Sequence, residues 1–212
     1  MRFIDSDEDV RMIVMWSGGI DSTYKLAWLL KETAHYVHAH HVHIVNREHR
    51  WNAERNACAR LLRKLRAIRP FGFSESTIDH SHHARIPFDM AIVAFEAGVV
   101  ARTGDAPGSE PFTHWTIGTH KGEGHYQRRF ALYEPMVNAV CFPEDYPEFE
   151  MGKVVTKAAE MEYLGSLGLL ADCWYCRTPR KGRPCGKCGA CAEVKEARAK
   201  RITKRDKRKI SR

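Results

Sequence analysis

The chain has 212 residues, of which 43% are hydrophobic and 28% are charged. This composition is typical of one globular domain with its own core and excludes global disorder. No apolar run approaches the roughly 20 residues needed to span a bilayer, and the acidic first ten residues do not resemble a signal peptide, so we expect a cytoplasmic protein without membrane contact.

The formal net charge is +8, and nearly all of it lies in residues 192–212, which hold ten basic and three acidic side chains. This basic tail is expected to be a solvated, partly disordered face, with nucleic-acid contact as the less favoured alternative.

Strand and helix patterns alternate along the chain from residue 11 onward. We expect strands at 11–16, 36–45, 71–78 and 114–118, and helices at 23–32, 51–67 and 88–102. The pattern weakens after Gly118, and Thr156 is expected to cap a helix that ends near Leu167. Such alternation predicts an α/β fold with a doubly wound, mostly parallel sheet of about five strands and helices on both faces.

The most specific motif is the loop Ser17-Gly18-Gly19-Ile20-Asp21-Ser22, which falls between a predicted strand and a predicted helix. Two glycines allow a tight turn close to an anion, and the free N–H groups at the start of a helix favour phosphate. The hydroxyls of Ser17 and Ser22 add donors, and Asp21 could orient the loop or help to hold Mg²⁺. The loop matches neither the Walker pattern nor G-x-G-x-x-G, so we interpret it as a phosphate-binding loop of another type.

Five of the seven cysteines are concentrated between residues 173 and 191. In a reducing compartment such spacing indicates a metal site more than disulfides, and a tetrahedral Zn²⁺ takes four thiolates. We therefore predict a structural zinc that closes a loop too short for a hydrophobic core. Its ligands are expected to be four of the five residues Cys173, Cys176, Cys185, Cys188 and Cys191.

The phosphate loop resembles the SGGxDS loop of the PP-loop ATP pyrophosphatases, and together with the cysteine spacing it resembles the 7-cyano-7-deazaguanine synthases of the queuosine and archaeosine pathway. Segments 46–54 and 146–168 are also similar to that family. The resemblance implies an adenine-nucleotide α-hydrolase-like fold and a ligase that uses ATP, Mg²⁺ and Zn²⁺. Its implied reaction converts 7-carboxy-7-deazaguanine and ammonia into 7-cyano-7-deazaguanine through an adenylated carboxylate, with release of AMP and pyrophosphate.

Carried onto this chain, the resemblance assigns ATP binding to Trp16, Ser17, Gly18, Gly19, Ile20, Asp21, Ser22, Thr23, Tyr24, Lys25 and Leu26. It assigns catalysis to Ser17 and Asp21, with His49 and Arg50 near the substrate pocket. Displacement at phosphorus requires no protein nucleophile, so positioning and charge neutralisation are expected to supply most of the catalysis.

One departure from the family leaves the substrate and the product open. The family's Asp-containing Y-P-D-C-R segment is absent from residues 118–130, where Glu123, His125 and Arg128 or Arg129 are expected to supply replacement contacts. The alternatives are a variant that stops at 7-amido-7-deazaguanine, another PP-loop enzyme such as a tRNA thiolase, and a non-catalytic zinc-ribbon module.

Local context and spacing disagree on the fourth zinc ligand. Cys173 is followed by Trp174, as the corresponding family cysteine is followed by an aromatic residue, whereas eight residues separate Cys176 from Cys185, which is the family's gap. We slightly prefer Cys173, because the preceding helix and turn fix its position while residues 177–184 can absorb extra length.

The strand at 36–45 carries four histidines, and alternation places His38 and His40 on one face and His41 and His43 on the other. A metal ion shared by all four is therefore not expected.

The predicted organisation has four parts: an N-terminal extension (1–10), an ATP-binding α/β domain (11–170), a zinc-binding cysteine segment (171–192) and the basic tail (193–212). The oligomeric state stays open, with a homodimer as one alternative.

Overall fold

The structure is a computed structural model that describes residues 10–84, 89–104, 109–123 and 126–210. The predicted N-terminal extension lies outside the described residues except for Val10, which is buried in the core.

A five-stranded sheet forms the centre of the molecule, and all its strand pairs are parallel. In the sheet order β3-β2-β1-β4-β5, the strands are Gly72–Asp79, Tyr36–Val45, Arg11–Met15, His114–Ile117 and Glu148–Phe149. The predicted α/β fold with a parallel sheet of five strands is confirmed. The chain order runs outward from β1 in both directions, so the carboxyl ends of β1 and β4 flank the crevice where such sheets bind ligands.

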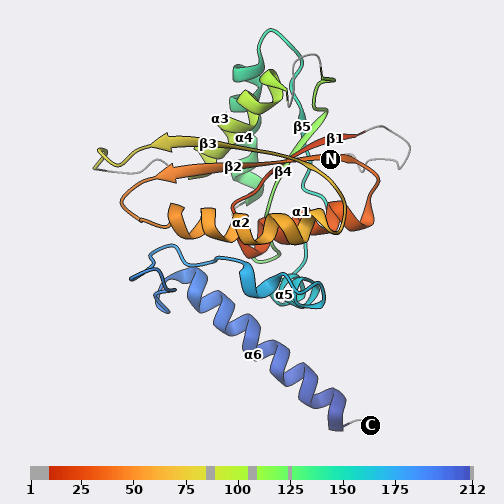
Figure 1. Ribbon diagram of the computed structural model, residues 1–212, viewed down its shortest axis with the longest axis vertical. Coiled ribbons are helices and arrows are strands. Elements are labelled where there is room, and N and C mark those ends of the chain that lie inside the picture. The colour runs from red at the N-terminus through yellow and green to blue at the C-terminus, as the bar shows by residue number, and fades with distance from the viewer. Residues whose placement is uncertain (1–9, 85–88, 105–108, 124–125, 211–212) are drawn as a thin grey trace.

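Helices cover both faces of the sheet (Figure 1). One face carries α1 (Ile20–Glu32) and α2 (Trp51–Arg66), with α5 (Lys157–Ser166) packed on the outer side of α1, and the other face carries α3 (Asp89–Thr103) and α4 (Tyr126–Cys141). This two-sided arrangement is what the alternation of strand and helix patterns predicts.

Side chains of β1 alternate between two separate cores. Met12 and Val14 pack with residues of α1 and α2, whereas Ile13 and Met15 pack with residues of α3 and α4. All four are buried, and burial of one such side chain contributes about 2 kcal/mol. The segment that follows β1 therefore starts from a strand held on both faces.

One element starts earlier than predicted, and two were not predicted. The first helix starts at Ile20 rather than at residue 23, so that Asp21 and Ser22 belong to its first turn. The region of weak pattern contains α4 and the two-residue strand β5, which were not predicted. Pro135 lies inside α4, and a proline is ordinarily a sign that a helix ends.

The basic C-terminal segment is a helix and not a disordered tail. Helix α6 (Gly189–Ile210) begins inside the cysteine segment and extends away from the body of the molecule (Figure 1). Val194 and Ala197 are buried where α6 packs on α5, so the start of the basic segment belongs to the folded body, and the helix continues to Ile210. No helix in the described part of the chain has the length and apolarity needed to cross a membrane.

Candidate functional site

The phosphate loop, residues 17–22, joins β1 to α1 at the carboxyl edge of the sheet. The Oγ atoms of Ser17 and Ser22 lie 3.1 Å apart, and the Ser17 N–H donates to Ser22 Oγ at 3.2 Å. Gly19 is the N-cap of α1, and its N–H donates to Ser17 Oγ at 3.3 Å. The first N–H groups of a helix have no intrahelical acceptor and form the positive end of its dipole. The loop therefore has the local geometry of an anion-binding site.

Two glycines allow the loop to lie close to its neighbours. Gly18 has a φ of 70°, and a Cβ atom there would lie 2.9 Å from Cys58 Sγ. Gly118 follows β4, and a Cβ atom there would lie 2.1 Å from the backbone nitrogen of Ser22. Since that contact is with backbone, only glycine fits at Gly118. The ends of β1 and β4 thus meet at the N-terminus of α1.

Charged side chains from three segments surround Asp21. Lys157, at the start of α5, donates to the Asp21 carboxylate, and His120 Nδ1 lies 3.5 Å from Asp21 Oδ1. Glu193 of α6 contacts both cations, with 2.7 Å to His120 Nε2 and 3.9 Å to Lys157 Nζ. Lys157 and His120 are both buried. We call Asp21, His120, Lys157, Glu160 and Glu193 the Asp21 cluster.

Protonation differs between Asp21, which is partly exposed, and the fully buried Glu160 of the same cluster. Burial and the nearby Asp21 charge raise the pKa of Glu160, which is fully buried. Burial also acts on Asp21, but its interactions with Glu160 and with Lys157 outweigh burial and hold the pKa of Asp21 below its ordinary value. At neutral pH, Asp21 therefore carries the negative charge and Glu160 keeps its proton.

His120 is the second cation of the Asp21 cluster. Burial lowers its pKa, but the hydrogen bond with Glu193 and the charge of Asp21 outweigh burial and raise the pKa above the ordinary 6.5. The imidazole is therefore more often protonated near neutral pH than a free histidine. It adds positive charge beside the phosphate loop.

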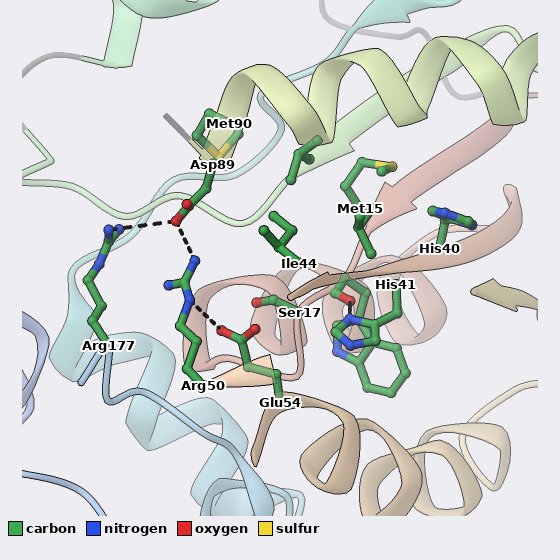
Figure 2. Close-up of a pocket in the computed structure, with 13 residues that line it drawn as sticks. Met15, Ser17, His40, His41, Ile44, Arg50, Glu54, Asp89, Met90 and Arg177 are labelled. Atoms are coloured by element: carbon green, nitrogen blue, oxygen red, sulfur yellow. Dashed lines mark hydrogen bonds and ion pairs between the residues drawn. The ribbon is translucent and has the colours of Figure 1, made fainter. Parts of the chain in front are cut away.

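A pocket of about 160 Å³ opens beside the phosphate loop (Figure 2). Apolar side chains of β1, β2 and α3 form much of its wall, and Ser17 is shared between the pocket and the loop. Small-molecule sites commonly combine apolar walls with a few convergent polar groups. The lining residues are Met15, Trp16, Ser17, His40, His41, Val42, Ile44, Arg50, Glu54, Asp89, Met90, Val93 and Arg177.

Charged groups gather at one end of this pocket (Figure 2). Arg50 forms ion pairs with Asp89, with Glu48 at 3.2 Å and with Glu54 at 3.5 Å. Arg177 Nη1 lies 3.8 Å from Asp89 Oδ2. Burial raises the pKa of Glu54 despite the Arg50 charge. The pocket end thus offers guanidinium donors beside carboxyl acceptors.

Four cysteines form one cluster, and together they could hold a metal ion. The Sγ atoms of Cys176, Cys185, Cys188 and Cys191 all lie within 4.8 Å of one another. The N–H groups of Lys187 and Cys188 donate to Cys185 Sγ at 3.4 and 3.3 Å. With the Thr178 hydroxyl, which contributes most, these bonds lower the pKa of Cys185 to about 5. Four sulfurs with backbone N–H support fit a tetrahedral Zn²⁺.

The structure contradicts the preference for Cys173 as the fourth ligand. Cys173 packs in the core on the α1 side of the sheet, and its Sγ donates to the Leu169 carbonyl at 3.5 Å. Burial raises the pKa of Cys173 to about 12, which disfavours the thiolate. The spacing argument, which favoured Cys176, was the better guide because Cys173 follows the short helix η1 (Leu170–Asp172) directly into the core.

The residues predicted to bind ATP fall into two groups. Ser17, Gly19 and Asp21 are at least partly exposed. The side chains of the other predicted residues are buried, and those of Trp16, Ile20, Tyr24 and Leu26 belong to the core. Lys25 donates to the Met151 carbonyl. Of these residues, only the loop and the start of α1 are therefore placed to contact a bound phosphate, and Trp16 also lines the pocket.

The remaining predicted site residues differ in whether they lie at the pocket. Arg50 lines the pocket, whereas His49 is exposed and does not line it. Glu123 accepts a hydrogen bond from Thr119 at 3.0 Å and lies 3.9 Å from His120 Nδ1. The predicted contacts of His125, Arg128 and Arg129 lie outside the part of the chain whose side chains are described.

The β2 histidines divide between the two faces of the sheet as alternation predicts. His40 forms hydrogen bonds with Ser74 at 2.7 Å and with Ser76 at 3.0 Å, and His41 Nδ1 bonds the Trp16 carbonyl at 2.9 Å. Burial lowers the pKa of each of these two histidines to about 4. Among the residues that the structure describes, no histidine belongs to a group arranged to hold a metal ion.

No protein-family model matches this chain, and no curated protein matches its sequence.

Proposed function

We propose that this protein activates a carboxylic acid with ATP and joins it to ammonia, converting 7-carboxy-7-deazaguanine into 7-cyano-7-deazaguanine. The observation that carries the proposal is the shared position of Ser17, which belongs to the phosphate loop and also lines the adjoining pocket. An ATP molecule bound at the loop would have its phosphates beside a molecule in the pocket. This arrangement suits attack of a substrate oxygen on the α-phosphorus.

The loop and the Asp21 cluster would bind the polyphosphate. The first-turn amides of α1 and the Ser17 and Ser22 hydroxyls are donors, and Lys157 and His120 add positive charge. Mg²⁺ prefers oxygen ligands, and Asp21 supplies an ionised carboxylate within the loop. Lys157 now contacts that carboxylate, so Mg²⁺ and Lys157 would compete for Asp21 and Lys157 would be free to contact phosphate.

The lining of the pocket supports the proposal that the second substrate is an aromatic acid. Its walls are largely apolar, which suits a flat ring, and its charged end holds the guanidinium groups of Arg50 and Arg177. Carboxyl groups of Glu54 and Asp89 lie at the same end and can accept from the N–H groups of a guanine-like ring. A ring that bears a carboxylate and an edge of N–H donors would match both the guanidinium groups and the carboxyl groups.

The proposed chemistry consists of two activations. The substrate carboxylate oxygen attacks the α-phosphorus, pyrophosphate leaves, and an acyl adenylate forms. Ammonia then attacks the carbonyl carbon, and AMP leaves to give the amide after loss of a proton. In the second activation, the amide oxygen attacks the α-phosphorus of a second ATP, pyrophosphate leaves, and loss of AMP and of both protons on the amide nitrogen yields the nitrile.

The cysteines do not favour the thiolase alternative. Sulfur transfer needs a reactive cysteine near the nucleotide, and the thiolate is the reactive form. Cys58 lies under the loop at Gly18, but burial raises its pKa far above the ordinary value, and Cys173 is buried in the same way. The four cysteines of the metal-ligand cluster contact one another instead.

Incubation of the protein with ATP, Mg²⁺, ammonium and 7-carboxy-7-deazaguanine, followed by mass analysis, tests the proposal. We expect AMP, pyrophosphate and the nitrile. Accumulation of the amide without nitrile would identify the variant that stops after the first activation. ATP consumption only in the presence of RNA would overturn the deazaguanine assignment.

A further inference from the structure

The cysteine loop, residues 173–191, reaches the candidate site through Trp174 and Arg177, and Glu193 directly beyond it makes a third contact. The Trp174 N–H donates to the Gly18 carbonyl at 2.9 Å, which pairs the cysteine loop with the phosphate loop. Glu193, two residues after Cys191, contacts His120 and Lys157 of the Asp21 cluster. Arg177, directly after Cys176, lines the pocket. The cysteine loop is therefore a wall of the site as well as a metal-binding segment.

Arg177 has fewer acidic partners than Arg50 and is more exposed. Arg50 is largely buried and is paired with Asp89, Glu48 and Glu54. Arg177 has one acidic contact among the described residues, at 3.8 Å from Asp89, and 54% of its side chain is exposed. A guanidinium has five N–H donors, and a carboxylate or phosphate can accept two of them side by side. Arg177 thus retains donors for an anionic ligand at the pocket end.

The charges at this end of the pocket favour a second cation. Three carboxyl groups, Glu48, Glu54 and Asp89, lie around the single guanidinium of Arg50. Arg177 offsets part of this negative charge, which an anionic substrate would otherwise meet. Figure 2 shows Arg177 and Arg50 approaching the Asp89 carboxylate from different sides.

The metal-ligand cluster fixes the backbone of Arg177. Its neighbour Cys176 belongs to the cluster, and Cys176 Sγ accepts a hydrogen bond from the Cys185 N–H at 3.2 Å. An ion bound by Cys176 would fix the residue directly before Arg177. The ion and the direction of Arg177 are therefore linked through one peptide group.

We propose that Arg177 is a substrate-binding residue that takes the anionic carboxylate of the acid, and that the metal ion bound by Cys176, Cys185, Cys188 and Cys191 holds it in place. This inference rests on the proposed function and extends it by naming the group that selects an acid over its neutral relatives. The metal acts here only through the position of the chain, without touching substrate.

The test compares the affinity of zinc-loaded protein for two ligands, 7-carboxy-7-deazaguanine and 7-deazaguanine, which lacks the carboxylate. We expect Arg177→Ala to weaken binding of the acid about tenfold or more, the loss typical of one charged hydrogen bond, and to leave binding of the neutral ring unchanged. Arg177→Lys should restore part of the affinity for the acid. Arg180→Ala is the matched control, because Arg180 is exposed in the same loop and does not line the pocket.

Metal removal supplies the second arm of the test. Chelation should weaken binding of the acid by wild-type protein and add little to the loss already caused by Arg177→Ala, since both changes remove the same contact. Circular dichroism monitors folding, and if the chelated protein unfolds, the zinc-loaded variants decide the question. If Arg177→Ala weakens binding of both ligands equally, or of neither, the inference is overturned while the proposed function stands. Failure of the wild-type protein to bind the acid would overturn the proposed function with it.

Discussion

Lys157 and Asp21 are separated by 136 residues in the sequence, and their side chains form an ion pair at the N-terminus of α1. Lys157 is the first residue of α5, whose N-cap Thr156 accepts from the Ala159 N–H at 3.3 Å. The capped start of one helix thus brings a lysine to the phosphate loop at the start of another.

The first prediction concerns the phosphate loop. Asp21→Asn and Ser17→Ala should each lower AMP and pyrophosphate formation by about 100-fold or more, the scale of losing one preorganised charge or donor in an active site. Circular dichroism should show both variants folded, because both side chains reach the surface. Asp145→Asn, at an exposed aspartate away from the site, is the control. Full activity in both loop variants would remove the assigned phosphate site.

The second prediction concerns the ion pair itself. Lys157→Met should lower the free energy of unfolding by about 3 kcal/mol, because it leaves the Asp21 carboxylate without its main partner in a largely buried site. The double variant Lys157→Met with Asp21→Asn should lose less free energy of unfolding than the sum of the losses in the two single variants. Urea denaturation measures all three, with the exposed Lys153→Met as the control. Strict additivity would show that the two residues do not interact.

The third prediction uses the raised pKa of Glu160. The unfolded chain releases this proton near the ordinary value of 4.5, whereas the folded protein keeps it to higher pH. Folded protein therefore binds more protons above that value, and this residue makes stability fall as pH rises, by at most about 1.4 kcal/mol per unit.

Glu160→Gln removes this dependence. It should therefore be more stable relative to wild type at pH 8 than at pH 5, and the two should converge toward pH 4. Thermal denaturation of Glu160→Gln across this range checks the prediction. Glu162→Gln, on the exposed side of the same helix, should show no such trend. A pH-independent difference for Glu160→Gln would contradict the assignment of a buried, protonated carboxyl group.

The fourth prediction concerns the metal ligands. Serine at Cys176, Cys185, Cys188 or Cys191 should release zinc and lower the melting temperature, because each removes one of four clustered sulfurs. Cys173→Ser should keep the zinc, because Cys173 lies outside the cluster. Zinc content by atomic absorption checks all five variants. Retention of zinc by all five would end the structural-zinc interpretation.

The parts of the fold that the sequence predicted have strong local patterns. The segment from Arg11 to Glu32 combines an apolar strand, two glycines and an apolar helix, so both elements and the loop between them were predictable. Helix α4 contains Pro135, and β5 has two residues that pair only with β4. Neither has a pattern that can be recognised without the rest of the fold.

The site was predictable where its residues are neighbours in sequence and not where folding brings them together. The loop residues 17–22 form a local motif. By contrast, His120 and Glu193 meet across 73 residues, and Arg177 enters the pocket only because the cysteine loop folds back on the phosphate loop. The slight preference for Cys173 over Cys176 was wrong for a similar reason, since the core position of Cys173 depends on tertiary packing.

The most direct test of the central claim is exchange of labelled pyrophosphate into ATP in the absence of ammonia. Reversible formation of an acyl adenylate predicts exchange that requires both Mg²⁺ and 7-carboxy-7-deazaguanine and that Asp21→Asn abolishes. Release of ADP and inorganic phosphate without exchange would show cleavage at a different phosphorus and would contradict the claim.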